Sequence, residues 1–178
     1  MPLPCARGGR LRAKPVGERY SLRMNGHPQV IAALNALLVD ELAAVDQYLA
    51  HAHKLRHWGY VHLAERLAHE VEDEKSHAEA LIRRILFLEG EPSMTPSPVT
   101  IGKSVVEILQ LDLAVERRVR ENIVRTMALC EAEHDFGSRE LLVPLLKDTE
   151  EDHMDWLEQQ LELIQTLGLP FYLQKQIA

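Results

Sequence analysis

The chain has 178 residues, of which 46% are hydrophobic and 26% charged, a balance typical of one soluble globular domain. No apolar run approaches the roughly 18 residues of a membrane span, and two cysteines are too few for a disulfide framework or a zinc ribbon. The net charge of −7 favours cations over nucleic acid as partners, and a reducing cytoplasm is the expected location.

The first 23 residues differ from the rest of the chain. They contain six lysines or arginines against Glu18 alone, so their local charge is +5 and the remainder carries −12. They have neither hydrophobic periodicity nor the apolar segment of a signal peptide, so they do not form a secretory signal. We expect residues 1–23 to be a disordered basic leader. Two alternatives stay open, namely a nucleic-acid-binding arm and a natural start at Met24.

Beyond residue 26 the apolar spacing predicts helices throughout. A first helix is expected over about 28–58, with Pro28 in its first turn and Gly59 after its end, and a second over about 61–89. Their apolar stripes are Leu34, Leu38, Val45 and Leu49, and then Leu63, Leu67, Val71, Leu81, Ile85 and Leu88.

A proline-rich connection, EGEPSMTPSPVT, follows and is long enough to cross most of a helical bundle. Ser104 and Glu107 form a capping box for a third helix, and HDFGSRE interrupts the pattern before a fourth helix that runs to about Leu167. Pro144 is expected to kink that helix or to mark its true start. The third and fourth stripes are Val105, Leu109, Leu113, Val119, Ile123 and Met127, and then Leu142, Leu146, Leu157, Leu161 and Ile164. A short tail helix completes a predicted all-α four-helix bundle.

Charged residues interrupt these apolar stripes in a repeated pattern. The first half supplies a glutamate and then Glu-x-x-His, and the second half repeats this arrangement with nearly the same gap. Because residues three apart share one helical face, the two halves are expected to point four carboxylates and two imidazoles at one place. The six residues are Glu41, Glu74, His77, Glu116, Glu150 and His153.

Four buried carboxylates require compensation, and the stripes offer no lysine or arginine at core depth. Four negative charges balance two divalent ions, and oxygen and imidazole ligands without sulfur suit iron or manganese. The set is the di-iron pattern of ferritin-like bundles. Protonated carboxyls, or helix rotations that expose the acids to water, remain as alternatives.

From Met24 to the C-terminus the chain resembles the bacterioferritin family, through NGHPQVIAALNALLVDELAAVDQY, HWG, EDEKSHAEALIRRILFLEG, HDFGSRE and DTEEDHMDWLEQQLELIQTLGLPFYLQ. The resemblance implies a ferritin-like domain over 24–178. It also implies a homo-oligomeric cage of 24 subunits that oxidises Fe(II) with dioxygen or peroxide, at two iron ions per subunit, and stores the ferric mineral.

Roles for individual residues follow from the same resemblance. It implies that Glu74 and Glu150 bridge the two irons. It assigns Glu41 and His77 to one iron and Glu116 and His153 to the other. It further implies that Tyr48 lies beside the site, as an electron donor or a hydrogen-bond donor, and that His69 and Asp73 form a weaker inner-surface iron site.

The chain departs from the family in two places. Lys75 occupies the position of the methionine that ligates haem, and an ammonium has no lone pair to donate. We therefore expect no haem in the homo-oligomer, although a mixed cage with a methionine-bearing bacterioferritin subunit could hold it. One extra residue in KDTEEDH must be absorbed before Glu150, for which a π-bulge is a candidate.

The remaining alternatives concern side chains and function class. His51, His53, His57 and His62 are interpreted as surface residues or as part of an ion path, Trp58 and Trp156 as packing residues, and Cys130 as a core residue. Rival functions are another di-iron carboxylate enzyme, a DNA-protecting mini-ferritin and a metal-free bundle.

Overall fold

The computed structural model describes residues 25–177, which form seven helical segments and no strand within that range. The predicted basic leader therefore lies outside the described residues. The segments are α1 (Pro28–His57), α2 (Val61–Phe87), α3 (Val105–Ala132), α4 (Phe136–Asp148), the π-helix η1 (Thr149–Met154), α5 (Asp155–Leu167) and α6 (Leu169–Gln174).

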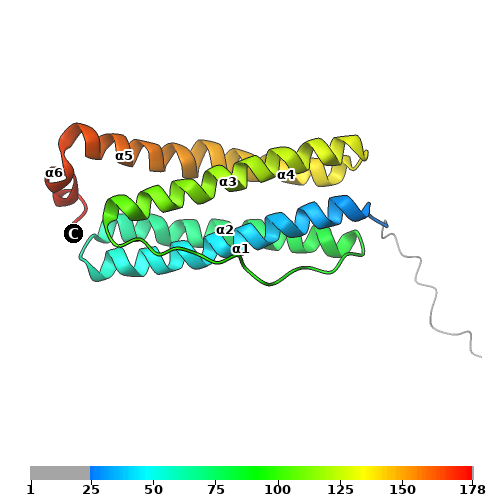
Figure 1. Cartoon of the computed structure of the whole chain (residues 1–178), viewed down its shortest axis with the longest axis horizontal. Helices are drawn as coiled ribbons and strands as arrows, with labels where there is room; N and C mark the ends of the chain where they lie inside the picture. Colours follow the sequence, from blue (N-terminus) through cyan, green and yellow to red (C-terminus); the bar gives the residue numbers. More distant parts are fainter. Residues whose placement is uncertain (1–24, 178) are drawn as a thin grey trace, which may run out of the picture.

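Four long helical rods run side by side, as the apolar stripes predict (Figure 1). α4, η1 and α5 follow one another without a break and make up the fourth rod. α1 packs on α2 and α3, and α3 packs on all three segments of the fourth rod. α6 turns back at the end of the bundle, where the amide of His62 donates to the carbonyl of Gln176 (3.2 Å). The fold is the predicted four-helix bundle with a short C-terminal helix.

Local sequence signals set the start of α3. Ser104 Oγ accepts a hydrogen bond from the amide of Glu107 (3.2 Å), as a capping box requires. The reciprocal bond goes one residue further back, because Glu107 Oε2 accepts from the amide of Lys103 (2.7 Å). α3 therefore begins where the sequence predicts, and both side chains satisfy amides that the helix leaves free.

The connection between α2 and α3 runs along α1, the long path that the prolines and length suggest (Figure 1). Near its start, Asn35 accepts from the amide of Ser93 (2.6 Å) and donates to the carbonyl of Glu91 (3.1 Å). Near its end, Lys54 Nζ donates to the carbonyl of Gly102 (2.6 Å). These bonds fix the crossover to α1 and leave the bundle interior to the four rods.

The extra residue in the fourth rod is absorbed by the π-helix, which contains both Glu150 and His153. The expectation of a π-bulge is thus confirmed, although the widened turn includes Glu150 and does not simply precede it. Pro144 lies well inside α4, which starts at Phe136, so the proline does not mark the start of the helix.

The predicted stripes supply most of the buried core, with one clear error. The six residues of the second predicted stripe are all buried, as are five of the six in the third. Of the fourth stripe only Leu142 and Leu157 are buried, and the other three residues are partly exposed. Leu49 of α1 is instead 45% exposed, because the buried face of α1 follows Ala44, Tyr48 and Ala52. Cys130 is fully buried, as expected for a core residue.

α1 is also the one helix among residues 25–177 that is long and apolar enough, by composition, to cross a membrane. Its most apolar 18-residue window is 44% buried within the bundle. The core helix of a globular protein passes the same test, and α1 packs along two other helices of the bundle. Its apolar character is accounted for by this packing.

Candidate metal centre

Five of the six predicted ligands converge in the bundle interior. They form two groups of three, one of Glu41, Glu74 and His77 and one of Glu74, Glu116 and His153. Within each group one ligand atom per residue lies within 4.8 Å of the others, and all five side chains are buried. α1, α2, α3 and η1 each contribute, so the cluster joins all four rods.

Glu74 belongs to both groups because its two oxygens face in different directions. Its Oε2 lies 3.3 Å from Nδ1 of His77, and its Oε1 lies 3.2 Å from Nδ1 of His153. Glu41 approaches the first histidine (3.9 Å) and Glu116 the second (3.4 Å). The two imidazole rings lie 6.0 Å apart, with Glu74 reaching both. This is the arrangement of a carboxylate that can bridge two cations.

The electrostatics of the cluster favour bound cations. Burial raises the pKa of Glu41 well above its ordinary value, and the Glu74 carboxylate adds to the rise. Burial also raises the pKa of Glu74, with Glu116 as the next cause. For His153, burial alone would lower the pKa, but contacts with Glu116, Glu70 and Glu74 outweigh it and the pKa is raised. The cluster therefore holds protons that a divalent cation would displace.

Several polar atoms of the cluster make no hydrogen bond within residues 25–177. They are both oxygens of Glu41, Oε2 of Glu116 and Nδ1 of His153, and all are buried. Buried polar atoms are normally hydrogen-bonded, so each exception needs an explanation. Coordination of a cation would give these atoms the partner that the protein itself does not supply.

Tyr48 lies beside the cluster, as the resemblance implies. Its hydroxyl donates to Oε1 of Glu116 at 2.5 Å, and its side chain is buried. Burial, and then the Glu116 charge, raise the pKa of Tyr48 well above its ordinary value, so the hydroxyl keeps its proton. Tyr48 thereby holds one oxygen of Glu116 and leaves the other facing His153.

Glu150 is the predicted ligand that the structure does not bring into the cluster. Its side chain is 38% exposed, and Oε1 accepts from Nε of Arg120 at 2.6 Å. The π-helix explains the separation, because it takes more residues per turn than an α-helix. Residues three apart, such as Glu150 and His153, then no longer return to the same face.

A buried carboxylate that the sequence analysis missed is Glu70. It is 1% exposed, and its Oε2 lies 2.8 Å from Nε2 of His153. Its position gives a signal, since it follows Leu67 by three residues and precedes Glu74 by four, on the apolar stripe of α2. The same stripe argument that selected Glu74 therefore could have selected Glu70.

A second buried polar group lies between α1 and α3. Nδ1 of His51 donates to Oδ1 of Asp112 (2.7 Å), because its Nε2 accepts from the amide of Gly102 (3.0 Å). Gln47 donates to the same carboxylate oxygen (2.8 Å). The surface interpretation is thus wrong for His51, which is fully buried. Asp112 gave a signal, since it precedes Glu116 by one helical turn.

His69 and Asp73 lie near each other outside the buried cluster. Nε2 of His69 is 3.4 Å from Oδ2 of Asp73, and the His69 side chain is 62% exposed. The pair is accessible to ions in solution. Asp73 also belongs to a third group of potential ligands, with Glu70, Asp152 and His153.

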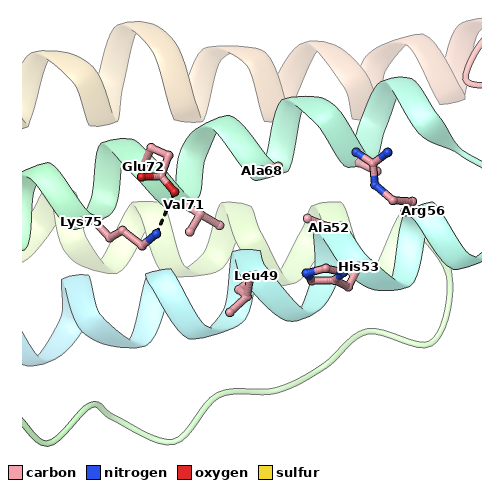
Figure 2. Close-up of a pocket in the computed structure, with 9 residues that line it drawn as sticks. Leu49, Ala52, His53, Arg56, Ala68, Val71, Glu72 and Lys75 are labelled. Carbon is pink, nitrogen blue, oxygen red and sulfur yellow. Dashed lines mark hydrogen bonds and ion pairs between the residues drawn. The ribbon is translucent and has the colours of Figure 1, made fainter.

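Lys75 lies on the outer side of α2, at a pocket of about 230 Å³ between α1 and α2 (Figure 2). Its ammonium donates to Glu72 at 2.7 Å, the contact drawn as a dashed line in Figure 2. Leu49 and Ala52 line the same pocket from α1. No side chain that lines this pocket carries a sulfur atom.

Comparisons with known proteins agree with this architecture. The family model "Ferritin-like domain" matches residues 31–167. A bacterial ferritin of Pseudomonas aeruginosa is 54% identical over 86% of this chain and 100% of its own length. A bacterial ferritin of Synechocystis sp. is 49% identical over 87% of this chain and its own full length. A bacterioferritin of Brucella melitensis is 42% identical over 82% of this chain and 90% of its own length.

Proposed function

Because the chain belongs to the bacterioferritin-type bacterial ferritins, which are iron-storage proteins, we propose that it oxidises Fe(II) to Fe(III) at the cluster around Glu74. The ferric product is stored as a mineral. Iron is thus the substrate and the cargo of the protein, and the activity is that of a ferroxidase.

The division of the Glu74 carboxylate between two histidine-containing groups is the observation that carries this proposal. Glu41 and His77 complete one iron site, and Glu116 and His153 complete the other. Both sites are built within one chain, which favours a bacterioferritin-type centre over a DNA-protecting mini-ferritin, whose sites form between subunits. The buried polar atoms without hydrogen bonds argue against a metal-free bundle.

Glu150 is proposed as the second bridging ligand. To bind the two ions, its carboxylate has to break the ion pair with Arg120. Its ion pair is half-exposed, and pairs of this kind contribute only about 0.2–1 kcal/mol. Two bound cations offer a stronger attraction. The π-helix then has to let Glu150 turn towards the bundle interior.

The chemistry needs two Fe(II) ions and one oxidant, dioxygen or peroxide. Each ion gives up one electron, and the bridging carboxylates hold the ions close enough for one oxidant molecule to meet both. Tyr48 positions Glu116 through its hydrogen bond and lies where it could supply a further electron. His69 and Asp73 are proposed to bind iron after it leaves the centre.

We further propose a hollow cage of 24 copies in the cytoplasm. Lys75 predicts that a cage built of this chain alone lacks haem, since no methionine sulfur faces the pocket of Figure 2. A mixed cage with a methionine-bearing subunit could still bind haem.

The direct test replaces Glu74 with alanine and follows aerobic Fe(II) oxidation by stopped-flow absorbance. Rapid oxidation should disappear, because neither iron site keeps its shared ligand, while native mass spectrometry still finds the cage. The matched control is Glu72→Ala, two residues away on the outer side of α2, which should oxidise iron like the parent. Fast oxidation by Glu74→Ala would refute the assignment of the site.

A further inference from the structure

Glu70 makes the closest contact with His153 in the structure, and none of the roles above uses it. Its Oε2 lies 2.8 Å from Nε2 of the ring, and both side chains are almost completely buried. The other ring nitrogen, Nδ1, faces Glu74 and Glu116. His153 therefore has one nitrogen towards the proposed iron site and one towards Glu70.

A carboxylate in this position can fix the orientation of the imidazole ring from the side opposite the iron site. A ring that binds metal through one nitrogen usually donates its other N–H to a carboxylate, which sets the tautomer and makes the ligating nitrogen more basic. With the proton on Nε2 towards Glu70, Nδ1 carries the free lone pair. That lone pair points towards the oxygens of Glu74 and Glu116, between which the ion would bind.

Glu70 is itself held in place by a charged partner. Its Oε1 lies 2.5 Å from Arg66, and the same guanidinium reaches Oδ1 of Asp152 at 2.6 Å. The guanidinium also lies over the ring of Trp156, 5.3 Å from its centroid. Arg66 compensates the buried charge that Glu70 would otherwise carry alone. Arg66 thus holds Glu70 where its Oε2 can accept a hydrogen bond from Nε2 of His153.

The other histidine of the centre lacks this support. The second nitrogen of His77 lies 3.3 Å from Asp148, whose side chain is 53% exposed. Solvent screens that contact and competes for it. The two histidines are therefore held unequally, His153 by a buried carboxylate and His77 by an exposed one.

We propose that Glu70, backed by Arg66, is the positioning residue of His153 and selectively stabilises iron binding on the His153 side of the centre. The proposal rests on the iron site proposed above. Glu70 also belongs to a group with Asp73, Asp152 and His153 that could hold a metal ion of its own. The positioning role accounts better for the contacts, since Arg66 already supplies the positive charge between two members of that group.

The test uses the assembled full-length protein and Co²⁺, a divalent probe with visible ligand-field bands. The parent should bind two Co²⁺ per subunit. In Glu70→Ala one ion should bind about 10–100-fold more weakly, with its bands altered, while the ion that binds first, at the unaffected half, keeps the parent's affinity and bands. Glu70→Gln should act in the same direction, because its amide can donate to Nε2 and move the ring proton to Nδ1. Glu72→Gln is the exposed control on the same helix.

A selective loss at one ion, with the thermal midpoint and cage size retained, supports the positioning role. Parent-like binding of both ions by Glu70→Ala would overturn it, and so would equal weakening of both, which indicates a structural role. A third Co²⁺ in the parent that is lost in both Glu70→Ala and Asp152→Asn would also overturn it, by making the group a metal site.

If neither Glu70 variant assembles, the Co²⁺ affinity and the ligand-field bands are measured for Arg66→Gln instead. One ion should again bind more weakly, but by a smaller factor because Glu70 remains. Parent-like binding in that variant overturns the proposal. Failure of the parent to bind any pair of Co²⁺ ions would refute the iron site itself. Normal parental binding with an unaffected Glu70→Ala refutes only the role of Glu70.

Discussion

Among individual residues, Glu41 is a buried acid whose negative charge is unfavourable in the metal-free protein. It is fully buried, and neither of its oxygens makes a hydrogen bond within the described chain. Its raised pKa means that the folded protein binds the proton more tightly than the unfolded chain does. The stability that this proton provides is complete below the ordinary value of 4.5 and is lost as the pH rises through the raised value.

Replacement of Glu41 by glutamine should therefore stabilise the iron-free protein increasingly as the pH rises. Near pH 4.5 the variant and the parent should melt alike, and towards pH 8 the variant should gain about 1–3 kcal/mol, the cost of an unsatisfied buried group. The measurement is the thermal midpoint in chelator over this pH range. Asp46→Asn, at an exposed position of α1, is the control. A gain that does not vary with pH would contradict the assignment.

Single residues also show what the sequence could and could not reveal about the site. Steps of three and four along apolar stripes selected five residues that the structure brings together in the buried cluster, because a helix puts such residues on one face. Glu70 lies on the same stripe but follows Arg66 by four residues, which is the pattern of an ordinary surface ion pair. His51 was misjudged because its partner, Asp112, lies on another helix, and spacing along one helix does not report contacts between helices.

At the scale of the helix, the π-turn η1 is the feature that sequence spacing described incompletely. One extra residue predicted a widened turn, which the structure contains. The consequence for Glu150 was not predicted, because the Glu-x-x-His spacing was interpreted with α-helical geometry. In the π-turn His153 stays in the cluster and Glu150 turns to Arg120.

Deletion of Thr149 tests this account of the helix. The flanking segments should keep their faces, because the π-turn absorbs one residue, and Glu150 should return to the side of His153. Co²⁺ should then bind about two- to fivefold more tightly, because Glu150 no longer has to break its surface ion pair with Arg120 before it binds the ion. The factor corresponds to the free energy of such a pair. Calorimetric titration measures this affinity. Arg120→Gln keeps the π-turn, so an equal gain in that variant would assign the effect to the ion pair alone.

For the whole molecule, the sequence predicted the bundle because every rod carries an apolar stripe that only its neighbours can cover. The long crossover followed from its length and prolines, and the structure adds the hydrogen bonds to Asn35 and Lys54 that hold it along α1. Leu49 was wrongly placed in the core. It lines the pocket on the face of α1 and α2 in Figure 2, and hydropathy does not distinguish such a surface from the interior.

That pocket allows a prediction about the assembled protein. Lys75→Met should allow haem to bind the purified homo-oligomer, because two symmetry-related thioethers would offer the sulfur ligands that the ammonium cannot. The parent should show no Soret band after incubation with haem, and the variant should show one. Lys75→Gln removes the charge without adding sulfur and should resemble the parent. Equal haem binding by all three proteins would contradict the role of this position.

The divided carboxylate of Glu74 has a consequence for the order in which ions arrive. The first ion to bind fixes the rotamer of Glu74, which the second ion also needs. The second ion therefore binds with a smaller loss of conformational entropy. Linkage makes this coupling reciprocal, whichever half fills first. The two halves should consequently load cooperatively, with few singly occupied subunits, so that both Fe(II) ions are in place to give one electron each to the same oxidant molecule.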